Sequence, residues 1–269
     1  MILKNLKIYS NGLLRRGALH LRDGSIKTIL YRVSEVELHQ YASENDVKTV
    51  IDCQDKVALP GIIDIHAHLR DMGQSDKETF HSGTEAAVYS GITTVFNMPN
   101  TVPPAISAEI VGDWMEKAKE SIHANVAFIA GVPEGIDEEE FERILELGVI
   151  GFKIYPLKSL NDVNWQEPTN LKKLLVLSSK YQIPIFIHPD LPISEEEKYR
   201  VMNQYGEGQS SLLKLHDDLY PVKTERSFIA YLLRIYEEII EEMQLTETKY
   251  PSVHLCHVSS KDAFNLIQE

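Results

Sequence analysis

The feature that most constrains the fold is a change of periodicity at Pro60. From there onward, short apolar runs rich in β-branched residues alternate with longer runs of helical periodicity. This alternation is typical of βα units that build a parallel sheet. About six units can be counted, whereas a closed parallel barrel has eight over roughly 250 residues. We therefore expect a polypeptide that was cut before its last two strands.

Each expected strand precedes an expected helix. The first strand follows Pro60 and Gly61, and the later strands are expected at 93–98, 125–130, 149–155, 183–188 and 252–258. Helices are expected from a capping box at 75–78 to about 90, after Ser107, before Gly148, at 170–181, at 228–243 and from about 260. The segment 189–224 is expected to be a long loop with short helices, punctuated at 205–208 and 220–221.

The first 55 residues have a different pattern, in which short alternating runs are separated by turn signals. Strands are expected at 2–9, 17–21, 25–31 and 49–53, with turns at 10–12 and 23–24 and a polar loop at 43–46. The sequence therefore predicts a small β-subdomain at 1–55, followed by a barrel of βα units at 56–269 that is incomplete at its C-terminal end.

Composition excludes several classes of partner. The formal net charge of −13 argues against nucleic acids and anionic membranes. No run reaches the roughly 18 consecutive apolar residues of a membrane span, and the first residues do not resemble a secretory signal. Cys53 and Cys256 lie far apart and imply no disulfide framework. We expect a cytoplasmic protein.

Two histidines lie at the end of the first expected barrel strand. Because side chains alternate along a strand, His66 and His68 project to the same side and can bind one metal ion. The alternative is a pair of polar residues that face solvent. The flanking Ile62, Ile63 and Ile65 indicate that both faces of the strand are covered, and a metal would offset the cost of burying two unpaired imidazoles.

Function in a parallel barrel lies at the C-terminal ends of the strands. Those ends carry a set of polar residues: His66, His68, Asn100, Lys153, His188 and His257. Four imidazoles alone suit one zinc ion, and two metals would need a bridging anion. Lys153 could supply one by taking up carbon dioxide as a carbamate. Ordinary burial as a paired cation is the alternative for Lys153.

The remaining histidines and Cys256 have simpler interpretations. His254 lies three positions before His257, so we expect it to face the helix layer, and Cys256 to share that orientation as a core residue. The other histidines are interpreted as surface or structural residues: His20, His39, His81, His123 and His216.

Four motifs together resemble one known family. The run PGIIDIHAHLR at 60–70 resembles the first-strand motif of the amidohydrolase superfamily, in its cyclic-amidase branch. The run GITTVFNMPNT at 91–101 is similar to the second-strand signature of dihydroorotases. The runs GFKIY at 151–155 and VHLCHV at 253–258 are similar to later strands of the same family.

The resemblance implies an α/β fold of the TIM-barrel (β/α)8 type with two zinc ions. Carbamylated Lys153 and a hydroxide would bridge them, with His66 and His68 at one ion and His188 and His257 at the other. It further implies that two residues at the mouth of the barrel, Arg70 and Asn100, hold the substrate carboxylate. The planar guanidinium of Arg70 suits that role, although a surface ion pair with Asp71 is its simpler interpretation, as a turn position is for Asn100.

The implied reaction is the reversible cyclisation of N-carbamoyl-L-aspartate to dihydroorotate in pyrimidine synthesis. Hydantoinase-like and allantoinase-like cyclic amidases rank second, because they generally lack this pairing of Arg and Asn. The run Arg70-Asp71-Met72-Gly73 departs from the usual Arg-Glu-Pro-Gly, and the catalytic aspartate of the family is expected beyond Glu269. We expect Asp64 to orient the ligands instead.

A different class of interpretation is a catalytically inactive homologue that serves as a scaffold. The expected partners are a small-molecule substrate and further copies of the chain, with another enzyme of the pyrimidine pathway as an alternative.

Overall fold

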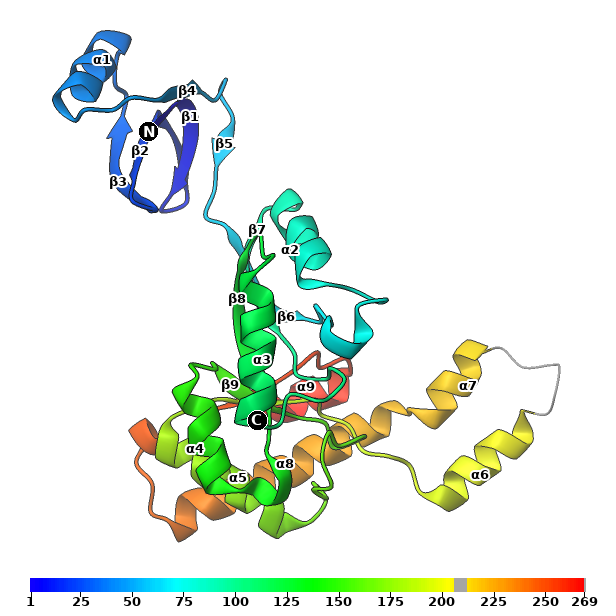
Figure 1. Ribbon diagram of the computed structural model, residues 1–269. Coiled ribbons are helices and arrows are strands. Elements are labelled where there is room, and N and C mark those ends of the chain that lie inside the picture. The colour runs from blue at the N-terminus through cyan, green and yellow to red at the C-terminus, as the bar shows by residue number, and fades with distance from the viewer. Residues whose placement is uncertain (206–211, 269) are drawn as a thin grey trace. The chain divides into compact units, whose positions relative to one another are not determined.

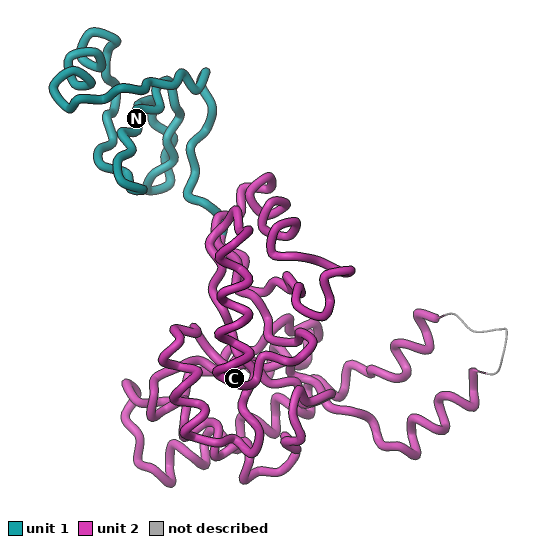
Figure 2. The backbone as a smooth tube through the Cα atoms, in the orientation of Figure 1, with its two compact units in different colours: residues 1–62 teal, residues 63–269 magenta. Residues whose placement is uncertain are grey.

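The computed structural model describes residues 1–205 and 212–268. The chain forms two compact units, residues 1–62 and residues 63–269 (Figure 2). Among the helices of the described residues, even the 21-residue α8 lacks the uninterrupted apolar length that a bilayer crossing needs.

The first unit is a mixed β-sheet with one helix. Its strands are β1 (Ile2–Ser10), β2 (Leu13–Arg22), β3 (Ser25–Tyr31), β4 (Val50–Asp52) and β5 (Val57–Ala58). The strand order is β3-β2-β1-β4, β5 also pairs with β1, and both β4 and β5 run parallel to β1. Asn11 and Gly12 both have positive φ, at 50° and 77°, as a two-residue type I′ hairpin turn requires.

Helix α1 (Glu35–Glu44) was not predicted, and it includes two residues of the expected polar loop at 43–46. Its start is a capping box, in which Ser34 accepts from the backbone of Glu37 and Glu37 bonds back to Ser34. Buried Leu38 and Ala42 attach the helix to the sheet. The Ser-x-x-Glu spacing was therefore the sequence signal for this helix.

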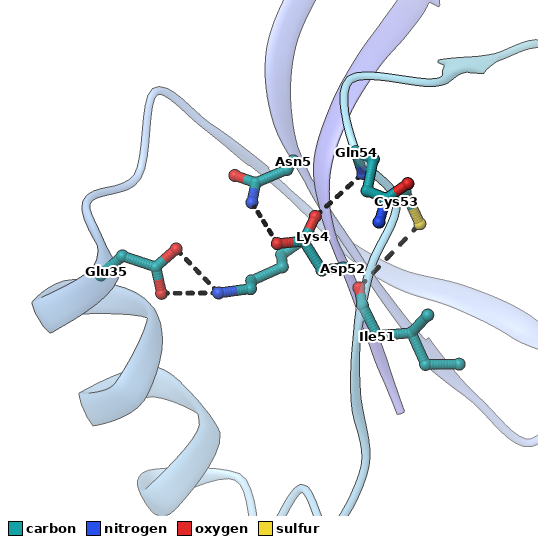
Figure 3. A network of polar contacts seen from close by, with 7 residues as sticks. All are labelled: Lys4, Asn5, Glu35, Ile51, Asp52, Cys53 and Gln54. Atoms are coloured by element: carbon teal, nitrogen blue, oxygen red, sulfur yellow. Dashed lines mark hydrogen bonds and ion pairs between the residues drawn. The ribbon is translucent and has the colours of Figure 1, made fainter.

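Polar contacts join α1 and β4 to the first strand (Figure 3). The Lys4 ammonium donates to both carboxylate oxygens of Glu35, at 2.8 and 2.9 Å. The Asn5 amide donates to Asp52 at 2.9 Å, and Asp52 also accepts from the backbone of Gln54. These contacts are solvent-exposed, so each contributes little stability, and burial of the apolar side chains dominates.

The second unit confirms the predicted parallel sheet. Its six strands neighbour one another in chain order: β6 (Ile62–Ala67), β7 (Ile92–Asn97), β8 (Asn125–Gly131), β9 (Gly151–Ile154), β10 (Ile185–Ile187) and β11 (Val253–Leu255). The sheet is a curled half-barrel, in line with the predicted fold class (Figure 1).

Helices alternate with these strands. They are α2 (Phe80–Tyr89), α3 (Ala108–Lys119), α4 (Glu138–Glu146), α5 (Pro168–Tyr181), α6 (Glu195–Gln204), α7 (Leu212–Leu219), α8 (Val222–Glu242) and α9 (Lys261–Gln268). Short 3₁₀ turns lie at Met72–Gln74, Glu134–Ile136 and Glu247–Lys249. Ser107 is the N-cap of α3, as predicted.

Other helix boundaries differ from the prediction. The helix expected from the capping box at 75–78 begins at Phe80, because Thr79 caps it and Ser75 instead donates to Asp71. Helix α8 begins six residues before the expected Phe228. The predicted loop at 205–208 lies largely outside the described residues.

The strands of the second unit separate two apolar layers. Phe152 and Ile154 of β9 belong to the large cluster beneath the helices, where the Phe152 ring stacks on Phe141 with centroids 3.8 Å apart. The opposite face of the sheet carries a smaller cluster built on Met98, Ile129, Phe186 and Cys256. Alternation along β9 therefore directs Lys153 away from the helices.

Strand β6 is not covered on both faces, which corrects the prediction. Ile62, Ile63 and Ile65 are 57%, 56% and 45% exposed. The reason is the position of β6 at one end of the six-stranded order, where it pairs with β7 on one side. The isoleucines therefore do not show that the two histidines are buried by flanking elements.

Candidate functional site

Four imidazoles lie next to one another at the C-terminal ends of the strands. The ring centroids of His66 and His68 are 5.2 Å apart, and those of His66 and His257 are 5.1 Å apart. His188 follows β10, and its Nδ1 lies 3.2 Å from Nε2 of His257. Strands at both ends of the sheet thus bring their histidines together.

These histidines line a pocket of about 290 Å³, close to the lower end of the range for small-ligand sites. Its lining consists of His66, His68, Asn100, Tyr155, Leu157, Lys158, His188 and His257. The described lining includes no Asp or Glu, so the catalytic aspartate that the resemblance implies stays a prediction. Asp64 accepts a hydrogen bond from the backbone N–H of His66 at 3.0 Å.

Asn100 fixes the orientation of one imidazole. Its side-chain oxygen lies 2.7 Å from Nδ1 of His68. Because an amide oxygen can only accept, Nδ1 carries the proton and Nε2 keeps its lone pair. His68 is thereby prepared to act as a ligand through Nε2.

Lys153 is buried beside the imidazoles, with 1% of its surface exposed. Its ammonium donates to Sγ of Cys256 at 2.8 Å and lies 5.1 Å from the centroid of the Tyr155 ring. Within the described residues no carboxylate pairs with it. Burial lowers the pKa of the Lys153 amine, which favours the neutral form that can react with carbon dioxide.

Burial also keeps the imidazoles neutral. It is the largest cause that lowers the pKa of His66, to about 3, with the nearby Lys153 charge as the next cause. Burial and neighbouring His257 lower the pKa of His188 to about 4. The pKa values of His68 and His257 are lowered as well, mainly by burial. Neutral imidazole is the form that binds metal ions.

The predicted orientation of His254 and Cys256 is wrong. His254 pairs in register with Phe186 and packs on its ring, and Cys256 lies with Phe186 in the cluster on the face of the sheet that carries Lys153. The prediction counted backward from His257, whose φ of 36° breaks the strand alternation. Cys256 is therefore a neighbour of the site.

Arg70 lies beside the pocket but is not among its lining residues. Its guanidinium donates to the backbone oxygen of Asn100 at 3.1 Å. The alternative ion pair with Asp71 does not form in the described structure, because the buried Asp71 carboxylate accepts from the backbone of Met72 and Phe80. Arg70, Asp71 and Met72 all have φ near +50°, which turns the chain sharply after the histidines.

The donor set fits a metal centre in its chemistry. Neutral imidazoles and a buried amine without a carboxylate partner are the groups that a divalent ion or a carbamate would use. Among residues 1–205 and 212–268, however, no three His, Cys, Asp or Glu side chains already meet in metal-binding positions. The hydrogen bond between His188 and His257 occupies one nitrogen of each ring, so a metal ion that binds through either of these two nitrogens must displace that bond.

Sequence reasoning missed several residues of this region. Cys256 was hidden by the break of alternation at His257. Tyr155 follows Lys153 by two positions, and this spacing was a usable signal. Lys158 lies in the loop after β9, where no periodicity predicts its direction.

Comparison with solved structures identifies the fold. L-hydantoinase from Arthrobacter aurescens superposes with a TM-score of 0.74 at 21% identity, over 94% of this chain and 57% of that one. The second unit thus has the fold of a partial TIM-type (β/α) barrel.

Sequence comparison identifies a narrower group of similar proteins. The Dihydro-orotase-like family model matches residues 55–154. A dihydroorotase from Methanosarcina acetivorans is 28% identical over 99% of this chain and 52% of its own length. An allantoinase from Arabidopsis thaliana is 37% identical over 67% of this chain and 35% of its own length. The chain is a dihydroorotase-like protein, and it spans about half or less of the length of these relatives.

Proposed function

We propose that the protein is a cyclic amidase that catalyses the dihydroorotase reaction, the reversible ring closure of N-carbamoyl-L-aspartate to dihydroorotate. The observation that carries this proposal is the convergence of four neutral imidazoles beside a buried amine in one small pocket. The similarity to dihydroorotases supports the substrate.

We further propose two zinc ions at this site, one held by His66 and His68 and the other by His188 and His257. Lys153, as a carbamate, would bind both. Bound zinc supplies polarisation of the amide carbonyl and lowers the pKa of a water molecule.

The protein's own groups prepare the site for this chemistry. Asn100 holds the His68 ring in one tautomer, and burial keeps the imidazoles unprotonated at neutral pH. Arg70 is proposed as a carboxylate ligand because its fork can form two parallel hydrogen bonds. To do so, its Nη1 must leave the backbone oxygen of Asn100.

The experiment is turnover of N-carbamoyl-L-aspartate and of dihydroorotate by the zinc-loaded protein at its natural length, which would include the catalytic aspartate that the resemblance implies, with zinc measured by mass spectrometry. We expect turnover in both directions, and loss of both turnover and bound zinc in His188→Ala. His39→Ala is the matched control, because His39 is exposed in the first unit and should change neither quantity. Full activity of His188→Ala would contradict the proposal.

Allantoinase activity is a second candidate. It is favoured by the higher identity to the plant allantoinase, although over a shorter stretch. Assay of allantoin beside dihydroorotate decides between the two reactions. A protein that purifies with little zinc and converts neither compound would support the scaffold interpretation.

A further inference from the structure

The pocket contains one formally charged side chain in its described lining. The imidazoles are neutral, and Asn100, Tyr155 and Leu157 carry no charge, which leaves the ammonium of Lys158. Lys158 is exposed on the loop after β9, and it forms no ion pair among residues 1–205 and 212–268. Within the described residues, its positive charge therefore borders the pocket without an ion-paired counter-charge.

Some other lysines of the second unit are ion-paired. Lys172 and Lys180 bond to glutamates at 3.0 Å or less, and Lys198 lies 3.6 Å from Glu195. Lys158 also lines the adjoining pocket at the base of α6 and α7, which Lys198 lines as well. A lysine that borders both pockets can reach a ligand in the first one by rotation of its flexible side chain.

The net charge of the chain makes a local cation important. At −13, the protein as a whole repels anions, so a carboxylate-bearing substrate needs positive charge at the pocket to bind and to be steered there. Arg70, the proposed carboxylate ligand, does not line the pocket and must first leave the backbone oxygen of Asn100. Lys158 is the cation whose position meets this need directly.

We propose that Lys158 is a specificity residue that selects cyclic amides bearing a carboxylate over uncharged ones. The inference rests on the proposed cyclic amidase function and names the substrate class of that site. The Lys158 ammonium attracts the carboxylate, whereas the imidazoles and the buried amine serve the reacting amide. Cyclic amides without a carboxylate gain no electrostatic attraction from this lysine.

The test uses two substrates that differ by one carboxylate, dihydroorotate and dihydrouracil. Lys158→Gln should lower kcat/KM for dihydroorotate about fivefold, as expected for an exposed ion pair, mainly through KM, and leave dihydrouracil within about twofold. Lys158→Arg should restore the preference, because it keeps the charge. Lys198→Gln is the matched control, since it removes the same charge from the adjoining pocket only.

Ionic strength gives a second readout. Added salt should raise KM for dihydroorotate in the wild type, and this dependence should flatten in Lys158→Gln. Equal losses for both substrates in Lys158→Gln would overturn the inference, as would an equal loss of preference in Lys198→Gln.

Failure of the proposed function is distinguishable from failure of this inference. If neither substrate is converted, calorimetric binding of the same two compounds to the zinc-loaded protein still measures the preference. Tighter binding of dihydroorotate that depends on Lys158 supports the inference without turnover. Equal binding of the two compounds, or a preference that Lys158→Gln leaves unchanged, overturns it.

Discussion

Replacement of Lys153 by methionine should stabilise the metal-free protein and at the same time weaken the proposed metal site. The Lys153 side chain is almost fully buried, and its amine bonds to a thiol, a weak hydrogen-bond partner. Methionine has a similar length and no charge. The substitution therefore removes a buried polar group without creating a large cavity.

The magnitude follows from two opposing terms. Burial of a poorly satisfied polar group costs about 1–3 kcal/mol, and the lost hydrogen bond to Cys256 contributes about 0.5–1 kcal/mol. The free energy of unfolding should thus rise by about 1–2 kcal/mol. For a chain of this size, that corresponds to an increase in Tm of about 3–6 °C.

Urea denaturation of the metal-free protein, followed by circular dichroism, measures the first effect. Zinc retained after gel filtration measures the second, and we expect it to fall about tenfold, as for loss of a residue that supports a metal site. Lys117→Met is the matched control, because exposed Lys117 should change stability by less than about 0.5 kcal/mol. A fall of more than about 1 kcal/mol in Lys153→Met would refute the reasoning, since it would mean that the buried amine stabilises the fold.

Three further predictions concern the site and its support. The metal-free protein should keep its full stability above the unfolded-state histidine pKa of 6.5 and lose it below, because His66 and His188 resist protonation only when folded. We halve the loss of unfolding free energy expected for two fully buried imidazoles, because both rings are partly exposed, which leaves about 2 kcal/mol at about pH 5. Urea titrations that show equal stability at about pH 5 and above pH 6.5 would contradict this prediction. Asn100→Ala should weaken zinc binding about 10-fold to 100-fold by freeing the His68 ring, as competition with a chelator can measure. Phe141→Ala should destabilise the fold by about 3–5 kcal/mol in thermal or urea unfolding, and a change below about 1 kcal/mol would argue against the stacked core.

The parallel sheet could be predicted from the sequence because each buried strand is a short apolar run between turn signals. Predicted strands such as 125–130 agree with the observed β8 to within one residue at either end. Local signals were less reliable at helix starts. Two capping patterns compete between Ser75 and Ser82, and the one that places Phe80 in the core forms the helix.

The positions of the candidate ligands at strand ends could be predicted for the same reason, since strand ends are visible in the sequence. The surroundings of these ligands could not be predicted from the sequence. The alternation rule fails at His257, where a left-handed backbone conformation reverses the direction of the side chain. Such a turn depends on how β11 meets the chain that follows, and no local pattern marks it.

The reversal at His257 also explains why the site includes a thiol. Because His254 and Cys256 keep the alternation of β11, Cys256 takes the position nearest to Lys153, and His257 turns back toward His188. One irregular residue thus gives a short strand two successive side chains on the same face of the sheet. The first is a buried contact for the amine, and the second adds an imidazole to the pocket. A strand with regular alternation would direct Cys256 and His257 to opposite faces of the sheet, so only one of them could reach the site. We therefore infer that the left-handed conformation at His257 is required for the arrangement of the site.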